Sequence, residues 1–307
     1  TYIHKGIDKE RAGTFLRSKS KSFGCTAKSR QPFTFRVSIY NKVASPKTVD
    51  VSTVRVCSSK DSLLTDSVLV DGKMYKWSVL AFPNSYNRQE TAYDLRLSCK
   101  QRLGDNPKVS LQIVGRDADV ELYRTSGEMF TDVLDPALNA GDCSRTVFSP
   151  SSSPDVISVG ATGYRTRFIN YLNEKKVYNN GTNGVRTPFS AMGPTFDGRI
   201  KPDVMAPGQN IISSYSSFYI NNTHREDGPV KNDLKSDIRR FKYNGRTYSW
   251  NANAGTSMSA PVVTGAIALW LQADPTLTTA DCMDIFAKTC THYDLSLSYP
   301  NNLYGYG

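Results

Sequence analysis

The chain of 307 residues lacks any apolar run close to the ~20 residues that a membrane-spanning helix needs. Its longest apolar run, residues 260–271, is interrupted by Pro261, Thr264 and Gly265. There is no internal repeat and no low-complexity tract. With 39% hydrophobic and 21% charged residues, the composition is that of a globular protein. We therefore expect one large or two ordinary domains and no membrane span.

Metal-binding patterns are missing as well. The six cysteines form no Cys-x-x-Cys pair and no Cys/His cluster with zinc spacing, so we expect no metal and no cofactor. An even number of cysteines permits disulfides, but Cys282 and Cys290 on one helix would lie ~12 Å apart, too far to bond. Free, buried thiols are the expectation, and cysteine usage does not decide the compartment. The cysteines are at positions 25, 57, 99, 143, 282 and 290.

The net charge of +10 raises the question of a polyanionic partner. Basic residues are dense over 5–30 and again over 235–242, but neither stretch carries a nucleic-acid-binding motif or an interleaved aromatic pattern of that kind. We interpret both as solvated surface and expect no nucleic-acid partner, with a polyanion site as the alternative.

Three regions of the sequence differ in composition and in the periodicity of their apolar residues. Residues 1–31 are basic and polar with little periodicity, and we expect an irregular connector there. Residues 32–142 contain stretches that alternate apolar and polar side chains, divided by turn signals such as Asp71-Gly72. This pattern favours an antiparallel sandwich or jelly roll. The alternating stretches are 33–40, 49–56, 75–80, 93–97, 109–113 and 120–123.

From residue 143 the pattern becomes α/β. Short apolar strands are expected over 156–160, 204–206 and 210–212, of the kind buried on both faces of a parallel sheet. Residues 260–271 are apolar almost all round and predict a buried helix. Thr278 to Asp281 resembles a capping box that opens a second helix over 279–288. Residues 143–307 are therefore expected to form an α/β unit.

The segment Gly255–Pro261, Gly-Thr-Ser-Met-Ser-Ala-Pro, places a serine at the start of the first of these helices. A serine hydroxyl attacks a carbonyl only with a base to take its proton and donors for the resulting oxyanion. A helix N-terminus offers unpaired N–H groups and a dipole that favours negative charge. A simpler interpretation of an isolated Gly-Thr-Ser is a serine that only caps the helix.

The whole segment resembles the serine signature of the subtilisin family of serine peptidases, in which this serine is the nucleophile. Further blocks resemble that family in family order, and together they cover about 143–307. The resemblance implies that Ser257 is the catalytic nucleophile and that Asp203 belongs to a structural turn. The further blocks are 155–162, 188–208 and 302–307.

Other parts of the family's catalytic machinery have no counterpart in the sequence. His4, His224 and His292 lack the family's His-Gly-Thr-His context, and neither its Asp-(Thr/Ser)-Gly acid motif nor its Ala-Gly-Asn oxyanion motif occurs. We expect surface or incidental packing roles for the three histidines. The chain alone should therefore be inactive as a peptidase.

The order of the regions resembles bacterial subtilases with a β-domain inserted ahead of the serine. It implies an inserted sandwich or jelly roll over 32–142 and the C-terminal half of a catalytic core over 143–307, part of a larger, exported subtilase. We then expect an extracellular or cell-envelope location, a polypeptide substrate, the missing N-terminal half as a partner, and self-association through exposed core surfaces. The alternative is a non-catalytic, subtilase-like protein whose sandwich binds protein or carbohydrate.

Overall fold

A computed structural model describes the chain over residues 2–7, 11–18, 20–40, 45–115, 117–126, 129–131, 141, 143–178, 181–222 and 234–307. The chain divides into two compact units, residues 1–144 and residues 145–307. Within the described ranges, no helix is long and apolar enough to cross a membrane.

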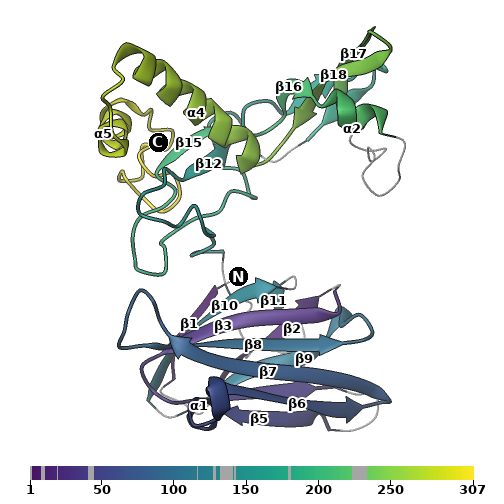
Figure 1. Ribbon diagram of the computed structural model, residues 1–307, viewed down its shortest axis with the longest axis vertical. Coiled ribbons are helices and arrows are strands. Elements are labelled where there is room, and N and C mark those ends of the chain that lie inside the picture. The colour runs from purple at the N-terminus through teal and green to yellow at the C-terminus, as the bar shows by residue number, and fades with distance from the viewer. Residues whose placement is uncertain are drawn as a thin grey trace. The chain divides into compact units, whose positions relative to one another are not determined.

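Unit 1, residues 1–144, consists of two antiparallel sheets (Figure 1). The first has the strand order β1 (Tyr2–Ile7), β10 (Ala118–Ser126), β3 (Ser22–Ser29), β8 (Thr91–Cys99), β7 (Lys73–Pro83) and β6 (Leu63–Val70). The second has the order β11 (Met129–Thr131), β2 (Arg11–Ser18), β9 (Gly104–Val114), β4 (Thr34–Ile39) and β5 (Lys47–Ser52). A short helix α1 (Thr53–Cys57) and a 3₁₀ turn (Lys60–Ser62) follow β5.

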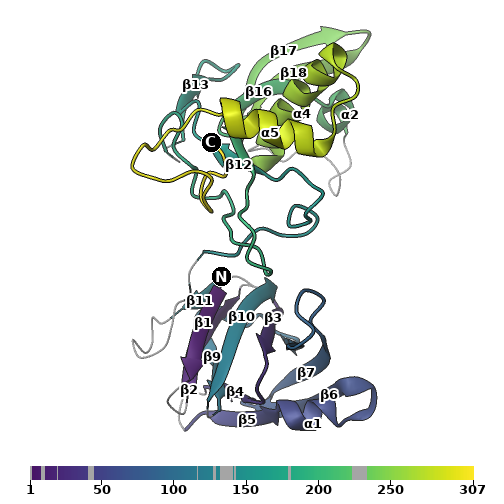
Figure 2. The ribbon, with the colours of Figure 1, turned by 90° about the vertical axis from the view of Figure 1, so that its left-hand side faces the viewer.

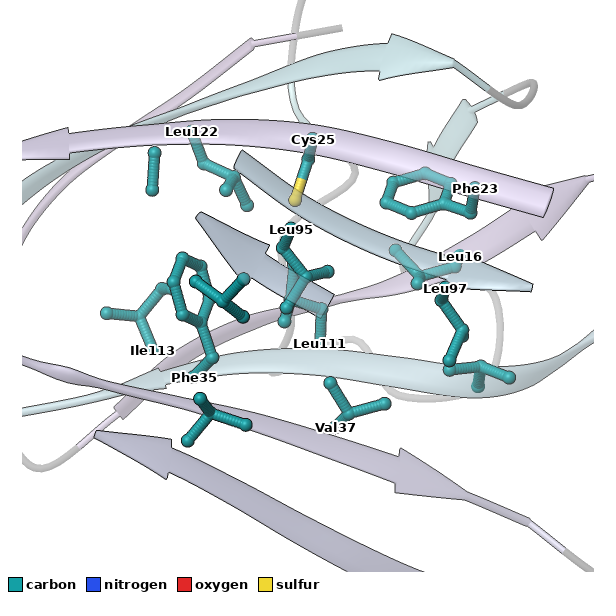
Figure 3. Packing of buried hydrophobic residues seen from close by; sticks show 14 of the residues in the cluster. Leu16, Phe23, Cys25, Phe35, Val37, Leu95, Leu97, Leu111, Ile113 and Leu122 are labelled. Carbon is teal, nitrogen blue, oxygen red and sulfur yellow. The ribbon is translucent and has the colours of Figure 1, made fainter. Parts of the chain in front are cut away.

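The core of unit 1 lies between these two sheets (Figure 3). Side chains of alternate residues on each strand point inward, so that Phe23 and Leu95 of one sheet meet Phe35 and Leu111 of the other. All four are almost completely buried. Each such burial contributes about 1.5–3 kcal/mol, which makes this cluster the main source of stability in the unit.

Two expectations for this unit were wrong. Residues 1–31 are not an irregular connector, because β1, β2 and β3 all lie there and belong to the sheets. In β3 the inward positions are Phe23, Cys25 and Ala27, and the small side chains made the alternation hard to see. The strand expected over 49–56 ends at Ser52, where α1 begins.

Unit 2, residues 145–307, has α/β architecture (Figure 2). Its parallel pair is β12 (Val159–Thr162) with β15 (Val204–Pro207), and its antiparallel hairpin is β13 (Arg167–Ile169) with β14 (Lys175–Val177). A three-stranded sheet has the order β16 (Ile211–Tyr215), β18 (Arg246–Asn253) and β17 (Asp237–Tyr243), with α2 (Ser217–Asn221) beside it. The longer helices are α4 (Thr256–Ala273) and α5 (Thr279–Thr289).

The core of unit 2 is small. Val204 and Ala206 of β15 pack against Val263 of α4 and Phe286 of α5. The helix α5 begins as predicted, since Thr278 and Asp281 form a capping box. Hydrogen bonds from the Thr278 hydroxyl and N–H hold the pKa of the Asp281 carboxyl below its usual value.

Two expectations here need correction. The helix α4 is not buried all round: Val262 and Leu269 are 46% and 68% exposed, and only Ser259 and Val263 are buried. Only one stripe of α4 packs on β12, β15 and α5, and the described residues leave its other sides open. The strand β16 pairs antiparallel with β18 rather than joining the parallel pair, because its apolar run ends after Ile212.

A buried carboxylate anchors the three-stranded sheet. Asp237 is fully buried and accepts hydrogen bonds from the Arg240 guanidinium at 2.5 Å, the Asn251 amide at 2.7 Å and the Ser249 hydroxyl at 3.1 Å. The guanidinium of Arg240 also stacks over the ring of Tyr171, 4.0 Å from its centroid. Charge and polar groups are therefore paired inside the unit, which ties β17 to β18.

Replacing this carboxylate should loosen the sheet. In Asp237→Ala the guanidinium of Arg240 and the amide of Asn251 lose their acceptor, and we expect a loss of about 3 kcal/mol in the free energy of unfolding. Amide hydrogen exchange over β17 and β18 should accelerate, while exchange in β7 and β8 of unit 1 stays unchanged. Unaltered exchange in β17 would contradict the anchoring role.

Candidate active site

The serine singled out by the sequence, Ser257, is the second residue of α4 and is exposed. The residue before the helix, Gly255, has φ +147° and ψ 163°, a conformation open to glycine but strained for other residues. The sharp entry into the helix therefore requires Gly255. It leaves the Ser257 hydroxyl at the helix N-terminus and accessible from solvent.

The first turn of α4 lies directly against the end of β15. The N–H of Gly255 donates to the carbonyl of Gly208 at 2.8 Å. A Cβ added at Gly208 would overlap the Ser259 Oγ and the Ala161 Cβ. Residue 208 therefore has to be glycine for the helix to approach the parallel strands this closely. The Ser259 Oγ is buried there, and the structure gives it no hydrogen-bond partner.

Backbone donors remain available at this helix end. The N–H of Met258 donates to the Gly255 carbonyl at 3.0 Å. Among the described residues, no acceptor is found for the N–H groups of Thr256 and Ser257, as is usual for the first turn of a helix. These N–H groups and the helix dipole favour a negative charge beside the serine. The arrangement can therefore stabilise an oxyanion formed at Ser257.

A pocket of about 220 Å³ reaches the residue before the serine. Thr256 lines it together with Val159 and Gly160 of β12, and Ala191 lies on another side. Phe148, 65% exposed, contributes to its rim. The sequence alone does not predict this pocket, because its walls come from five separate segments and none of them carries a motif for it. The remaining lining residues are Thr146, Val147, Ser149, Ser151, Ser158, Ser190 and Pro202.

The block around Asp203 holds the parallel strands in place. The carboxylate of Asp203 accepts from the backbone N–H of Ser158 and from the Lys201 ammonium, each at 2.6 Å. Lys201 is 3% exposed and also donates to the carbonyl of Val156 at 2.7 Å. These two hydrogen bonds of the Asp203 carboxylate hold the backbone near β12 and β15 in place. They agree with the structural turn that the resemblance implies for Asp203.

The other sequence blocks meet at the same strands. The N–H of Met205 donates to the carbonyl of Gly307 at 2.8 Å, so that the C-terminal residues run along the outer edge of β15. At the edge of β12, the N–H of Ala161 donates to the Ser190 hydroxyl at 3.0 Å and its carbonyl accepts from the N–H of Thr187 at 2.9 Å. Segments far apart in the chain therefore hold β12 and β15, the two strands on which α4 packs.

Of the three histidines, His292 alone lies in the described part of unit 2. His292 stacks on Tyr299 with 4.0 Å between ring centroids, a packing contact. His4 lies in β1 of the other unit, and His224 lies outside the described residues. In the described ranges, no three side chains of His, Cys, Asp or Glu gather as a metal site would need.

Cys25, Cys57, Cys99, Cys282 and Cys290 are free thiols, but not all of the six cysteines are buried as expected. Cys57 and Cys143 are exposed, whereas burial raises the pKa of the Cys25 and Cys290 thiols. The thiols of Cys25 and Cys290 are therefore held in their neutral, less reactive form.

Comparisons with known proteins agree on unit 2. The model of the subtilase family matches residues 137–307. The serine protease AprX of Bacillus subtilis is 34% identical over 140 residues, which are 46% of this chain and 26% of AprX. An uncharacterised protein of Aquifex aeolicus is 32% identical over 164 residues, 53% of this chain and 62% of that protein. The chain thus spans less than two thirds of either relative.

A solved structure resembles the whole chain in fold. The Clostridium perfringens CspB protease aligns with a TM-score of 0.58 and 20% identity, over 100% of this chain and 54% of that one.

The contact at Gly208 gives a direct test of how the helix is placed. We expect Gly208→Ala to lower the free energy of unfolding by about 1–3 kcal/mol, because the added methyl group overlaps Ser259 and Ala161. Hydrogen exchange in the first turn of α4 should accelerate. Gly265→Ala on the same helix is the control: nothing lies within 4 Å of its added Cβ, and it should stabilise by about 0.5–1 kcal/mol. Equal effects of the two changes would contradict the proposed packing.

Proposed function

The chain belongs to the subtilase family, and we propose that it is the nucleophile-bearing part of a serine endopeptidase, with Ser257 as the nucleophile. The observation that carries this proposal is an exposed serine at the N-terminus of α4, beside backbone N–H groups without an acceptor. Curated relatives described as serine proteases support the chemistry at the level of the family.

In the proposed reaction, the Ser257 Oγ attacks the carbonyl carbon of a peptide bond while a base takes its proton. The carbonyl oxygen gains negative charge and is stabilised by the N–H of Ser257 at the helix end. The protonated base then gives its proton to the nitrogen of the peptide bond, so that collapse of the intermediate expels an amine and leaves an acyl-enzyme that water hydrolyses. The sequence contains neither the family's histidine motif nor its aspartate motif. In the proposed reaction, the base and the acid that orients it therefore come from a segment outside this sequence.

We propose that this segment is an N-terminal half of the catalytic domain and that it is the natural partner of unit 2. The uncovered apolar side chains of α4, Val262 and Leu269 among them, support a partner surface there. We also propose that the isolated chain associates with itself through the same surface. Without its partner, the isolated chain is proposed to be inactive as a peptidase.

We further propose that unit 1 is a β-sandwich of the jelly-roll type inserted ahead of the serine, residues 1–144 rather than 32–142. Its two antiparallel sheets and the whole-chain likeness in fold to a protease structure support this. An extracellular or cell-envelope location is part of the proposal by family resemblance.

The pocket beside Thr256 is proposed to take a side chain of the substrate. It opens next to the nucleophile, and its volume of about 220 Å³ admits a single side chain of ordinary size. Val159 and Ala191 give it an apolar lining, and hydroxyls such as that of Ser190 add polar groups.

One observation favours a second candidate, a non-catalytic protein whose sandwich binds protein or carbohydrate. A hollow of about 900 Å³ lies on the six-stranded sheet of unit 1, and most of the residues that line it carry a hydroxyl or a charge. The charges belong to Asp66, Lys76, Asp94 and Arg96, and such a surface suits a polar ligand. Its hydroxyls belong to Ser22, Thr65, Ser67, Ser78, Ser98 and Thr125.

The first test of the peptidase is covalent labelling. In the full-length protein that contains this chain, a fluorophosphonate probe should label Ser257, and Ser257→Ala should abolish the labelling, as read by mass spectrometry. Ser259→Ala is the matched control from the same segment, since its hydroxyl has no hydrogen-bond partner, and it should retain labelling.

The same experiment separates the two candidate functions. The 307-residue chain alone should label and hydrolyse peptides at less than about a thousandth of the full-length rate, because it lacks the base. A folded full-length protein that does not label at all would sink the peptidase proposal and favour the binding protein.

The pocket is tested by filling it. Ala191→Phe should lower kcat/KM of the full-length enzyme about tenfold for substrates with a large side chain at the cleaved residue, and leave those with a small one nearly unchanged. Steady-state kinetics on a matched pair of peptides measures both. An equal loss for the two peptides would place the substrate side chain elsewhere.

A further inference from the structure

One face of the β17–β18 hairpin carries a cluster of arginine and aromatic side chains. The register pairs Arg239 with Trp250, Phe241 with Tyr248, and Tyr243 with Arg246. Directly paired residues share a face of a sheet, so these six side chains lie together. The rings of Phe241 and Tyr248 confirm this, since they stack with centroids 5.4 Å apart.

This Arg/aromatic face, defined by the six residues of the three pairs, is open. Phe241, Tyr243 and Trp250 are 48%, 64% and 46% exposed, and Arg239 is exposed as well. On β16, β17 and β18 the only acidic residue is Asp237, which is buried on the opposite face with Arg240. The face therefore presents positive charge and no carboxylate.

Neither arginine of the face is paired with an acid among the described residues. Arg246 lies over the ring of Phe218 on α2, 3.8 Å from its centroid, and its Nε is buried without a hydrogen-bond partner. A guanidinium held in this way is oriented in advance and still has donors to offer. Exposed large aromatics beside such cations are typical of surfaces that bind a partner.

The face is continuous in sequence with the nucleophile. Strand β18 ends at Asn253 and α4 begins at Thr256, so only Ala254 and Gly255 separate the hairpin from the catalytic segment. A polypeptide bound at Ser257 could thus extend along β18.

We propose that the Arg/aromatic face binds an acidic segment of the polypeptide substrate, and that this segment lies outside the pocket beside Thr256. This rests on the proposed peptidase function and adds a substrate class to it. Carboxylates of the substrate accept hydrogen bonds from the guanidinium groups of Arg239 and Arg246. The CH₂ groups of the same substrate side chains pack on the exposed rings. The contact recruits substrates with an acidic stretch next to the cleaved bond.

The continuity of β18 with the segment that carries Ser257 favours a polypeptide over single-stranded nucleic acid. Phe241 and Tyr248 stack on each other, and Arg246 covers Phe218. The guanidinium donors of Arg239 and Arg246 suit carboxylates.

The test measures binding without cleavage. In full-length protein carrying Ser257→Ala, fluorescence anisotropy would follow a labelled peptide rich in Glu and Asp, and the same peptide with Gln and Asn. The acidic peptide should bind more tightly and lose affinity as salt rises. The double variant Arg239→Glu/Arg246→Glu should weaken its binding about tenfold and leave the neutral peptide unchanged.

Matched controls carry the same change of charge elsewhere. Lys242→Glu lies on β17 but on the opposite face, and Arg167→Glu lies on β13. Each should change the affinity less than about twofold. Arg239→Gln, an exposed and mild change, repeats the test if the double variant melts at a lower temperature. Equal losses from Lys242→Glu, or no loss from either variant of the face, would overturn the proposal.

Other occupants give distinct results. Tighter binding of a single-stranded oligonucleotide that the double variant abolishes would overturn the proposal, as would a dimer that dissociates in it. Fluorophosphonate labelling of the Ser257 protein is read separately. Loss of acidic-peptide binding with labelling intact removes only the substrate class, whereas absent labelling removes the peptidase function itself.

Discussion

The close contact between Gly208 and the first turn of α4 is the constraint on which the candidate site depends. The hydrogen bond from Gly255 to Gly208, 2.8 Å long, joins the end of β15 to the start of the helix. Because neither residue has a side chain, the backbone segments approach closely, and Ser259 fills the remaining space. The Ser257 hydroxyl and the neighbouring N–H groups are positioned by this contact and not by contacts of their own.

The strands under that contact are held mainly by polar interactions. The core of unit 2 contains few buried apolar residues, and two parallel strands alone make a weak sheet. The buried ion pair of Lys201 and Asp203 and the C-terminal residues along β15 stabilise these two strands. Unit 1 is built differently, on a large apolar core between two complete sheets.

The distribution of polar groups separates structure from recognition within unit 2. On one face of the β17–β18 hairpin, Asp237 and Arg240 satisfy each other and hold the strands together. On the other face, the arginines have no carboxylate among the described residues and the rings are exposed. A paired charge in the interior stabilises the fold, whereas an unpaired one at the surface remains available to a partner.

Local features could be read from neighbouring residues. The segment 255–261 made Ser257 the candidate nucleophile, the capping box at Thr278 placed the start of α5, and alternation located β4, β7 and β8, because each of these depends on neighbours within a few residues. Other features depend on contacts between distant segments. Residues 1–31 become strands by pairing with β8, β9 and β10, far along the chain. Likewise, the exposure of α4, the pocket beside Thr256 and the face of the hairpin depend on which distant segments pack together, and periodicity carries no information about that.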